Sequence, residues 1–183
     1  MDGTIALGLY REPLREMIHE LKYGGVAVLA RPLGAMLATE VASRLSEGDF
    51  LVTFVPVHPG RRKERGYDQA ELLARQVSSC LGLPFVPLLR RTRPTRPQVE
   101  LGFEERRENV RDAFQPSAPC LSGKSRGRSI LLVDDVFTTG ATLCEGAKVL
   151  KKWGAKSVVA CVLARDLPEV PGLGPRLRTN NTK

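Results

Sequence analysis

The stretch ILLVDDVFTTGATL, residues 130–143, decides the fold of this chain. Its apolar first half predicts a buried strand, and this strand ends in two acidic residues, Asp134 and Asp135. A turn rich in glycine and threonine follows, and a helix begins directly after it. Ligands of α/β sheets bind at the carboxyl ends of strands, where a helix N-terminus presents backbone N–H groups to an anion. The stretch therefore predicts a phosphate site at one edge of a sheet.

The two carboxylates beside this phosphate site need an explanation of their own. They would repel a phosphate unless they serve another group, and ribose hydroxyls or a bound magnesium ion are suitable partners. Gly140 lets the backbone approach a phosphate closely, and the threonine hydroxyls can donate further hydrogen bonds. A tight strand–helix turn capped by threonine is the alternative. It accounts for the glycine and the threonines but not for the carboxylates.

Apolar runs on either side of this stretch predict two more buried strands, LVTFVPV at 51–57 and SVVACVLA at 157–164. Apolar residues at helical spacing predict four helices, over residues 14–24, 32–45, 67–81 and 143–153. Strands that alternate with helices are typical of a parallel α/β sheet. We therefore expect the strands at 51–57, 130–135 and 157–164 to be neighbours in one sheet.

The remaining segments carry weaker signals. Prolines weaken a strand over 83–89, and a charged short helix or turn is expected over 104–111. Residues 58–66 and 116–128 are expected to form a basic loop and a linker, and residues 90–98 an exposed, mobile loop. One domain is expected over 1–166, helical in its N-terminal part at about 10–47, with a flexible tail at 167–183.

Composition limits the class of protein. A chain of 183 residues with 42 % hydrophobic residues can bury a core, and charged residues or prolines interrupt every apolar run before it could span a membrane. The start of the sequence has no basic region typical of a secretion signal, so a cytoplasmic protein without membrane insertion is expected. The four cysteines form no CxxC pair, so we expect neither zinc nor disulfides in this chain, and core thiols instead.

Positive charge is concentrated in the middle of the chain. The net charge is +8, and residues 58–111 hold twelve Lys or Arg against seven Asp or Glu. Such a stretch suits a phosphate-rich ligand, either a diphosphate or a nucleic acid. A solvated basic face is the alternative, and charge alone does not choose between them.

Residues 130–142 resemble the phosphoribosyl-diphosphate-binding motif of type I phosphoribosyltransferases: four hydrophobic residues, two acidic, two hydrophobic, then TTG-x-T. The resemblance implies the type I phosphoribosyltransferase fold, a mainly parallel central sheet flanked by helices. It implies that Asp134 and Asp135 hold the ribose hydroxyls. It further implies that the ribose phosphate is bound by Thr138, Thr139, Gly140, Ala141 and Thr142. The diphosphate, with Mg²⁺ entering through it, would be bound by Arg61, Arg62, Lys63 and Arg65.

Two longer strings, VPVHPGRRKERGYDQAELLA at 55–74 and RRTRPTRPQVELGFEERRENVRDAF at 90–114, resemble those of the competence protein F family. The string LREMIHELKYGG at 14–25 is also similar, so the resemblance covers residues 10–165. It implies a role in natural transformation, with single-stranded DNA and proteins of the competence machinery as candidate partners. Contacts to the DNA backbone would come from Arg90, Arg91, Arg93 and Arg96.

The sequence also departs from these families. Many competence protein F relatives begin with a four-cysteine zinc ribbon that this sequence does not contain; a late start, a trimmed sequence and a ribbonless member are the alternatives. Purine-salvage transferases often carry a carboxylate at the position of Thr138, and none is present here. No catalytic residue is assigned. A ligand-binding protein of DNA uptake, an active transferase of unknown acceptor and a catalytically inactive scaffold remain open.

Overall fold

A computed structural model describes residues 1–45, 48–94 and 103–166 of the chain, and the backbone alone at 103, 104, 106 and 107. The predicted tail at 167–183 and residues 95–98 of the predicted mobile loop therefore lie outside the described residues. Among the helices described, none combines the length and the apolar character needed to cross a membrane.

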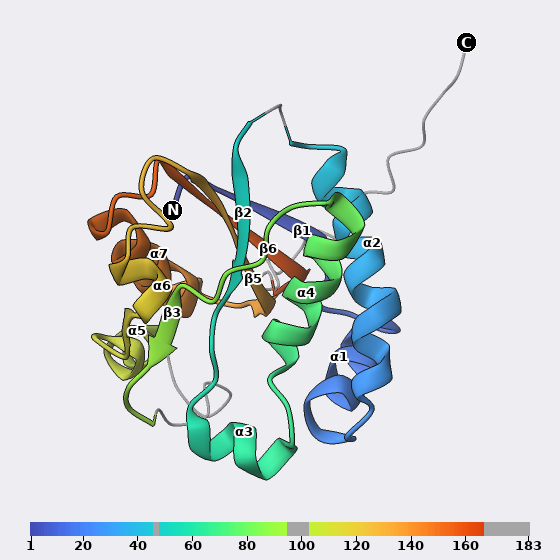
Figure 1. The fold of residues 1–183 in the computed structure, drawn as a ribbon. Helices are drawn as coiled ribbons and strands as arrows, with labels where there is room; N and C mark the ends of the chain where they lie inside the picture. The colour runs from blue at the N-terminus through green and yellow to red at the C-terminus, as the bar shows by residue number, and fades with distance from the viewer. Residues whose placement is uncertain (46–47, 95–102, 167–183) are drawn as a thin grey trace, which may run out of the picture.

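Four parallel strands form the central sheet (Figure 1). Their order across the sheet is β1 (Gly3–Leu9), β6 (Ser157–Arg165), β5 (Ser129–Phe137) and β2 (Phe50–Phe54). The three predicted strands are therefore neighbours, as expected, and the acidic pair lies near the carboxyl end of the central strand β5. Strand β1 was not predicted, because its short sequence GTIALGL contains two glycines and has little strand character of its own. It pairs along the outer edge of β6.

Side chains alternate along β5, and both of its faces are buried. Leu131 and Val133 belong to one apolar core, whereas Ile130 and Leu132 belong to the other. A strand buried on both faces needs an unbroken apolar run, which is why ILLV was recognisable in the sequence.

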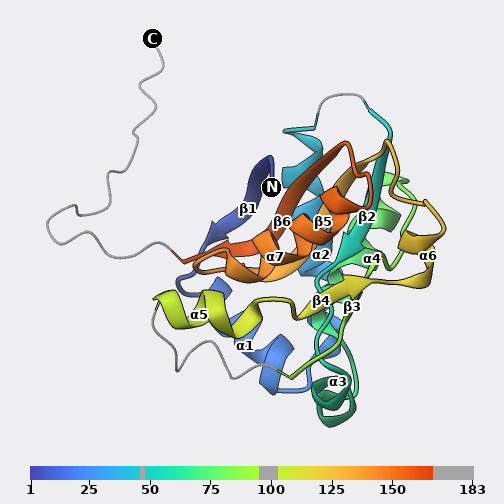
Figure 2. The same cartoon turned by 90° about the vertical axis from the view of Figure 1, so that its left-hand side faces the viewer.

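Helices cover both faces of the sheet (Figures 1 and 2). One layer consists of α1 (Leu14–Tyr23), α2 (Ala30–Ala42), which follows the short 3₁₀ helix η1 (Ala27–Leu29), and α4 (Gln69–Leu81). The opposite layer contains α7 (Ala141–Lys152), α6 (Ala118–Leu121), α5 (Phe103–Val110) and an antiparallel ribbon of β3 (Leu89–Arg91) with β4 (Phe114–Pro116). The predicted helices and the charged helix over 104–111 are thus present.

Several local predictions were wrong. The predicted basic loop at 58–66 contains a helix, α3 (Pro59–Arg65), because His58 and Pro59 form a suitable N-terminus for it. Of the predicted strand over 83–89, residues 83–88 show an isolated parallel bridge of Phe85 with Val52 and no strand. The ribbon strand β3 begins at Leu89 and takes up Arg90 and Arg91, which were expected in a mobile loop.

The cysteines also differ from the prediction of core thiols. Cys120 and Cys161 are buried, but Cys80 and Cys144 are exposed. Both exposed thiols lie on amphipathic helices, α4 and α7, whose apolar stripes are formed by other residues.

Helix α2 offers a direct test of the first core. Leu33 has no exposed surface, whereas Met36 on the same helix is 52 % exposed. We expect Leu33→Ala to lower the free energy of unfolding by about 2–5 kcal/mol, because a cavity remains in the core. The matched control Met36→Ala should change it by no more than about 0.5 kcal/mol. Urea unfolding monitored by circular dichroism measures both, and equal losses would contradict this packing.

Candidate functional site

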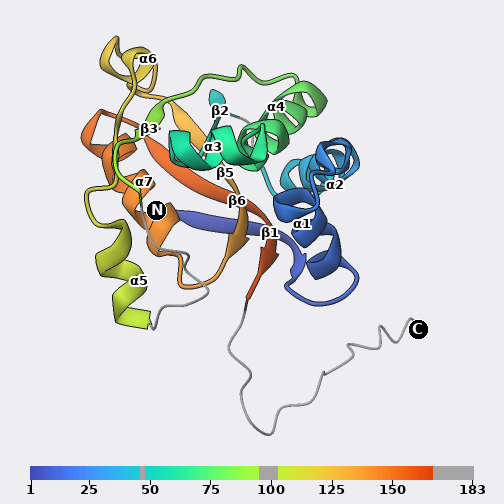
Figure 3. The ribbon, with the colours of Figure 1, turned by 90° about the horizontal axis from the view of Figure 1, so that it is seen from below.

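A cavity of about 890 Å³ lies at the carboxyl edge of the sheet. Figure 3 looks toward this edge and shows α1 and α3 beside it. Six of the residues predicted from the sequence to bind a ligand line the cavity together: Arg61, Arg65, Asp134, Asp135, Thr138 and Thr142. Segments that are far apart in the chain therefore meet at one site, as the predicted phosphate loop requires.

The turn between β5 and α7 has a backbone shape that demands glycine. Gly140 has a φ of 73°, and a Cβ atom at this position would lie 2.6 Å from Cζ of Phe137. The same residue is the N-cap of α7, and the N–H of Ala141 donates to Oγ1 of Thr139 over 3.4 Å. The turn thus presents threonine hydroxyls and the N-terminus of a long helix, an arrangement suited to a phosphate.

The two adjacent carboxylates have different surroundings. Asp135 is buried: its Oδ1 lies 3.0 Å from Nζ of Lys22, and its Oδ2 accepts a hydrogen bond of 3.0 Å from Nε2 of Gln69. Asp134 is half-buried in the cavity wall, and its Oδ1 accepts a hydrogen bond of 2.8 Å from the backbone N–H of Asp135. Only Asp134 therefore has an oxygen left for the cavity without displacing a partner.

The charge state of this cluster follows from burial and from its neighbours. Burial, followed by repulsion from Asp135, raises the pKa of Asp134 well above its ordinary value. Burial lowers the pKa of Lys22, but attraction to Asp135 outweighs it, so that the pKa of Lys22 is raised overall. Lys22 therefore stays charged at neutral pH and compensates the buried carboxylate. Its place in the site was not predicted, although it belongs to the quoted string at 14–25.

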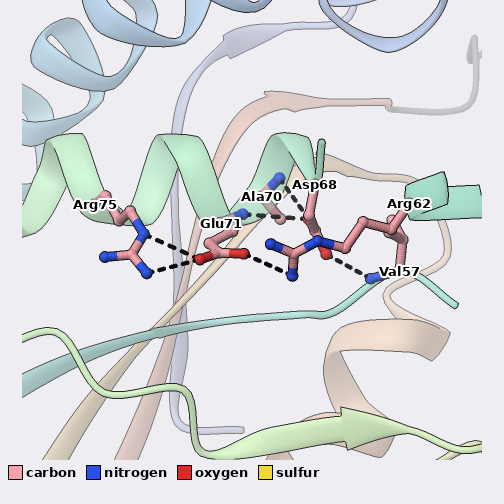
Figure 4. Close-up of polar contacts among 6 residues, drawn as sticks. All are labelled: Val57, Arg62, Asp68, Ala70, Glu71 and Arg75. Atoms are coloured by element: carbon pink, nitrogen blue, oxygen red, sulfur yellow. Dashed lines mark hydrogen bonds and ion pairs between the residues drawn. The ribbon is translucent and has the colours of Figure 1, made fainter. Parts of the chain in front are cut away.

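Of the four basic residues predicted to bind a diphosphate, two line the cavity, Arg61 and Arg65. Nη1 of Arg65 donates to Oε1 of Gln69 over 3.2 Å, and its guanidinium lies 4.9 Å from the centre of the Tyr23 ring. Arg62 instead forms an ion pair of 3.0 Å with Glu71 (Figure 4). Lys63, like Arg62, is not among the residues that line the cavity. A helical α3 turns its basic side chains in several directions, whereas a basic loop was expected.

Asp68 holds the basic helix α3 in place between β2 and α4. One of its carboxylate oxygens accepts the backbone N–H of Val57 over 2.8 Å (Figure 4). The other accepts the N–H groups of Ala70 and Glu71 and so caps the start of α4. Burial raises the pKa of Asp68, and these hydrogen bonds oppose that increase. The ends of the segment that carries Arg61 and Arg65 are thereby fixed relative to each other.

Arg91 is a cavity residue that the sequence assigned to a different role. It was expected in a mobile, DNA-binding loop, but it lies in β3, lines the cavity and places its guanidinium 5.2 Å from the centre of the Phe114 ring. Burial lowers the pKa of Arg91, and the nearby Asp134 opposes this decrease. Alternation along a strand separates it from Arg90, which is exposed and donates to Gln115.

The other predicted DNA contacts lie away from the cavity. Arg93 is exposed and donates to the backbone carbonyls of Glu108 and Arg111. Arg96 lies outside the described residues. The four arginines predicted as one group are therefore divided, with Arg91 in the cavity and Arg90 and Arg93 on the surface.

Comparison with known proteins agrees with this fold. Residues 26–170 match the family described as "Phosphoribosyl transferase domain". Among solved structures, the glutamine phosphoribosylpyrophosphate (PRPP) amidotransferase from B. subtilis aligns with a TM-score of 0.48 and 22 % identity, over 73 % of this chain. The chain spans about a quarter of that protein, 25 % of its length.

Sequence relatives define the family more narrowly. Competence protein F of Haemophilus influenzae is 34 % identical over 169 residues, which cover 90 % of this chain and 73 % of the relative. DNA utilization protein YhgH of Escherichia coli (strain K12) is 34 % identical over 163 residues, covering 86 % and 70 %. The chain therefore belongs to the competence protein F family of phosphoribosyltransferase-domain proteins.

The raised pKa of Asp134 predicts that this residue lowers the stability of the ligand-free protein. The folded state binds a proton there more tightly than the unfolded chain does. The stability that this proton gives to the folded state is therefore fully present below the ordinary pKa of 3.8, and it is lost as the pH rises through the raised pKa. We expect Asp134→Asn to increase the Tm at neutral pH, with the increase disappearing in acid. Melting curves across pH test this.

The matched control is Asp166→Asn, because Asp166 also lines the cavity but is exposed. This substitution should change the Tm less than Asp134→Asn does. An Asp134→Asn protein that melts no higher than wild type at neutral pH would contradict the assigned cause.

Proposed function

We propose that the cavity binds phosphoribosyl diphosphate, or a closely related ligand with a ribose phosphate and a second phosphate group. One observation carries this proposal: a phosphate turn, a ribose-facing carboxylate and several guanidinium groups line the same cavity. Four arginines line it: Arg15 of α1 is paired with Glu12, and Arg61, Arg65 and Arg91 come from α3 and β3. Guanidinium groups are suited to phosphate because their donors match its oxygens in pairs.

Each part of the ligand has a complementary part of the site. The ribose phosphate would be bound by the turn at 138–142, where Thr138, Thr142 and the N-terminus of α7 face it. The diphosphate would be bound between α3 and β3, from which Arg61, Arg65 and Arg91 reach the cavity. The ribose hydroxyls would then lie beside Asp134, between the two phosphate sites.

Magnesium would enter the site with the diphosphate. Within the part of the chain that the structure describes, no three His, Cys, Asp or Glu side chains come together to hold a metal ion. Mg²⁺ is commonly held by one or two carboxylates together with the phosphates of a ligand, and it keeps several waters. The oxygens of a bound diphosphate would supply ligands for such an ion, which would neutralise part of the phosphate charge.

The names of the relatives support a role in the use of incoming DNA. Competence protein F and the DNA utilization protein are named for such processes. We propose that this chain acts in the cytoplasm on single-stranded DNA, together with proteins of the competence machinery. Transfer of the ribose phosphate to an acceptor, and a purely structural role, are the alternatives. Release of diphosphate on addition of single-stranded DNA would favour transfer.

Binding of phosphoribosyl diphosphate is tested by calorimetry with the ligand and Mg²⁺. We expect Arg61→Ala and Arg91→Ala each to weaken binding by roughly 10- to 150-fold, because each removes hydrogen bonds between charged groups. The matched control is Arg62→Ala, which removes the same charge from the same helix but outside the cavity. It should weaken binding far less. A wild-type protein that binds no phosphoribosyl diphosphate would refute the proposal.

Binding of DNA would use exposed arginines outside the cavity. Arg90 and Arg93 are exposed, and their described contacts are to uncharged groups, so both retain their charge for phosphates. We expect Arg90→Ala with Arg93→Ala to reduce the salt slope for a single-stranded oligonucleotide by about 1.4, at ~0.7 for each phosphate contact. Arg91→Ala is the control, since it should affect the oligonucleotide less than phosphoribosyl diphosphate. Fluorescence anisotropy across a salt series measures this, and wild-type binding without salt dependence would contradict it.

A further inference from the structure

We propose that the two adjacent carboxylates have different roles, so that Asp134 alone accepts the ribose hydroxyls. Asp135 is instead a positioning residue that joins α1 to α4 through Lys22 and Gln69. This inference rests on the proposed function, because it concerns the way in which the same cavity would recognise a ribose. It differs from the expectation, drawn from the family resemblance, that both carboxylates hold the ribose.

The geometry of β5 supports this division. Successive side chains of a strand point to opposite faces of the sheet. Leu131 and Val133 pack into the core beneath α1, α2 and α4, and Asp135 continues that face. Asp134 continues the face of Ile130 and Leu132, on which the β3–β4 ribbon packs. Two neighbouring residues of a regular strand therefore do not present their carboxylates to one ribose in the same way.

The contacts of Asp135 account for both of its oxygens. Lys22 lies 3.0 Å from Oδ1 and Gln69 donates to Oδ2 over 3.0 Å, while only 7 % of the side chain is exposed. A ribose hydroxyl that bound there would have to displace one of these buried partners. An unpaired buried ammonium group or amide is costly, so the displacement would oppose binding.

The same contacts link residues of four elements that line the cavity into a closed ring. Lys22 on α1 contacts Asp135 on β5, Gln69 on α4 joins Asp135 to Arg65 on α3, and Arg65 lies over the ring of Tyr23, which again belongs to α1. The hydroxyl of Tyr67 also donates to the carbonyl of Leu21, over 2.7 Å. Lys22 is therefore a positioning residue too, because its contact with Asp135 helps to hold Arg65 where the diphosphate would bind.

The division also sets the charge of Asp134. The charged groups that act on it are Asp135 on its own strand, Lys22 from α1, Asp68 from the start of α4 and Arg91 from β3. Lys22 and Arg91 favour the ionised form that accepts ribose hydroxyls, whereas Asp135 and Asp68 oppose it. Removing Lys22 or Asp135 should therefore shift the pH dependence of ribose binding in opposite directions, without touching the ribose.

The test is calorimetry with phosphoribosyl diphosphate and Mg²⁺ across a pH series, with inorganic diphosphate as the ligand that lacks a ribose. We expect Asp134→Asn to weaken phosphoribosyl diphosphate binding by roughly 10- to 150-fold and to leave inorganic diphosphate binding little changed. Asp135→Asn should weaken phosphoribosyl diphosphate binding much less at neutral pH. Because it removes the repulsion that raises the pKa of Asp134, it should also let binding persist to a lower pH than in wild type. Equal losses for the two variants would overturn the division of roles.

Variants of Lys22 provide the second arm. Lys22→Met removes the compensating charge, so Asp134 should take up a proton at a higher pH than in wild type. As the pH is lowered, binding should therefore be lost earlier in this variant, whereas Lys22→Arg should keep the wild-type pH profile. The double variant Lys22→Met with Asp135→Asn removes one charge of each sign. It should fold even where Lys22→Met does not, and its pH profile should return toward that of wild type. A double variant whose profile matches that of Lys22→Met would also overturn the inference.

Failure of the proposed function gives a different result. If wild-type protein binds no phosphoribosyl diphosphate at any pH, the proposed function is wrong and the ribose assignment falls with it. If wild type binds and Asp135→Asn loses as much affinity as Asp134→Asn, the function stands and only the division between the carboxylates is wrong.

Discussion

The constraint on which the site depends is the alternation of side chains along a strand that is buried on both faces. Strand β5 directs Leu131 and Val133 into one core, and Ile130 and Leu132 into the other. The same alternation continues into the acidic pair at its carboxyl end and places two carboxylates in two environments. One becomes part of the scaffold, and the other faces the cavity. Most features of the site follow from that separation.

Charge compensation is the second consequence of this arrangement. Asp135 is tolerated inside the protein because Lys22 and Gln69 satisfy it. Asp134 has no comparable cation paired with it in the described contacts, and its pKa is raised as a result of burial and of Asp135. The ligand-free protein thus holds a carboxylate in an unfavourable setting, a common property of binding sites that are complete only with their ligand.

Much of this fold could be predicted from the sequence, because its central strands are apolar throughout and its phosphate turn has a specific pattern. Strand β1 could not be predicted, since it is stabilised by pairing with β6 and not by its own composition. The helical character of α3 could not be predicted from its run of basic residues, which is typical of a loop, although Pro59 at its start favours a helix.

Within the site, the sequence indicated which residue types bind phosphate but not which copies of them reach the cavity. Arg61 and Arg62 are neighbours, yet only Arg61 lines the cavity, while Arg62 pairs with Glu71. Arg90 and Arg91 are divided in the same way by β3. Such choices depend on the face of a helix or strand, and therefore on where each element begins. Lys22 is distant in sequence from Asp135, and only the fold reveals their contact.

The contacts of α1 are unevenly distributed between its two ends, and this affects how the site can adjust to a ligand. Its last turn is tied to the rest of the site by Leu21, Lys22 and Tyr23, through Tyr67, Asp135 and Arg65. Its first turn is held only by local contacts: the carboxylate of Glu12 accepts the backbone N–H of Glu16 over 3.2 Å, and both residues are exposed where they line the cavity. Adjustment to a bulkier ligand would therefore be concentrated in the first turn, while the last turn, which helps to position Arg65, would stay in place.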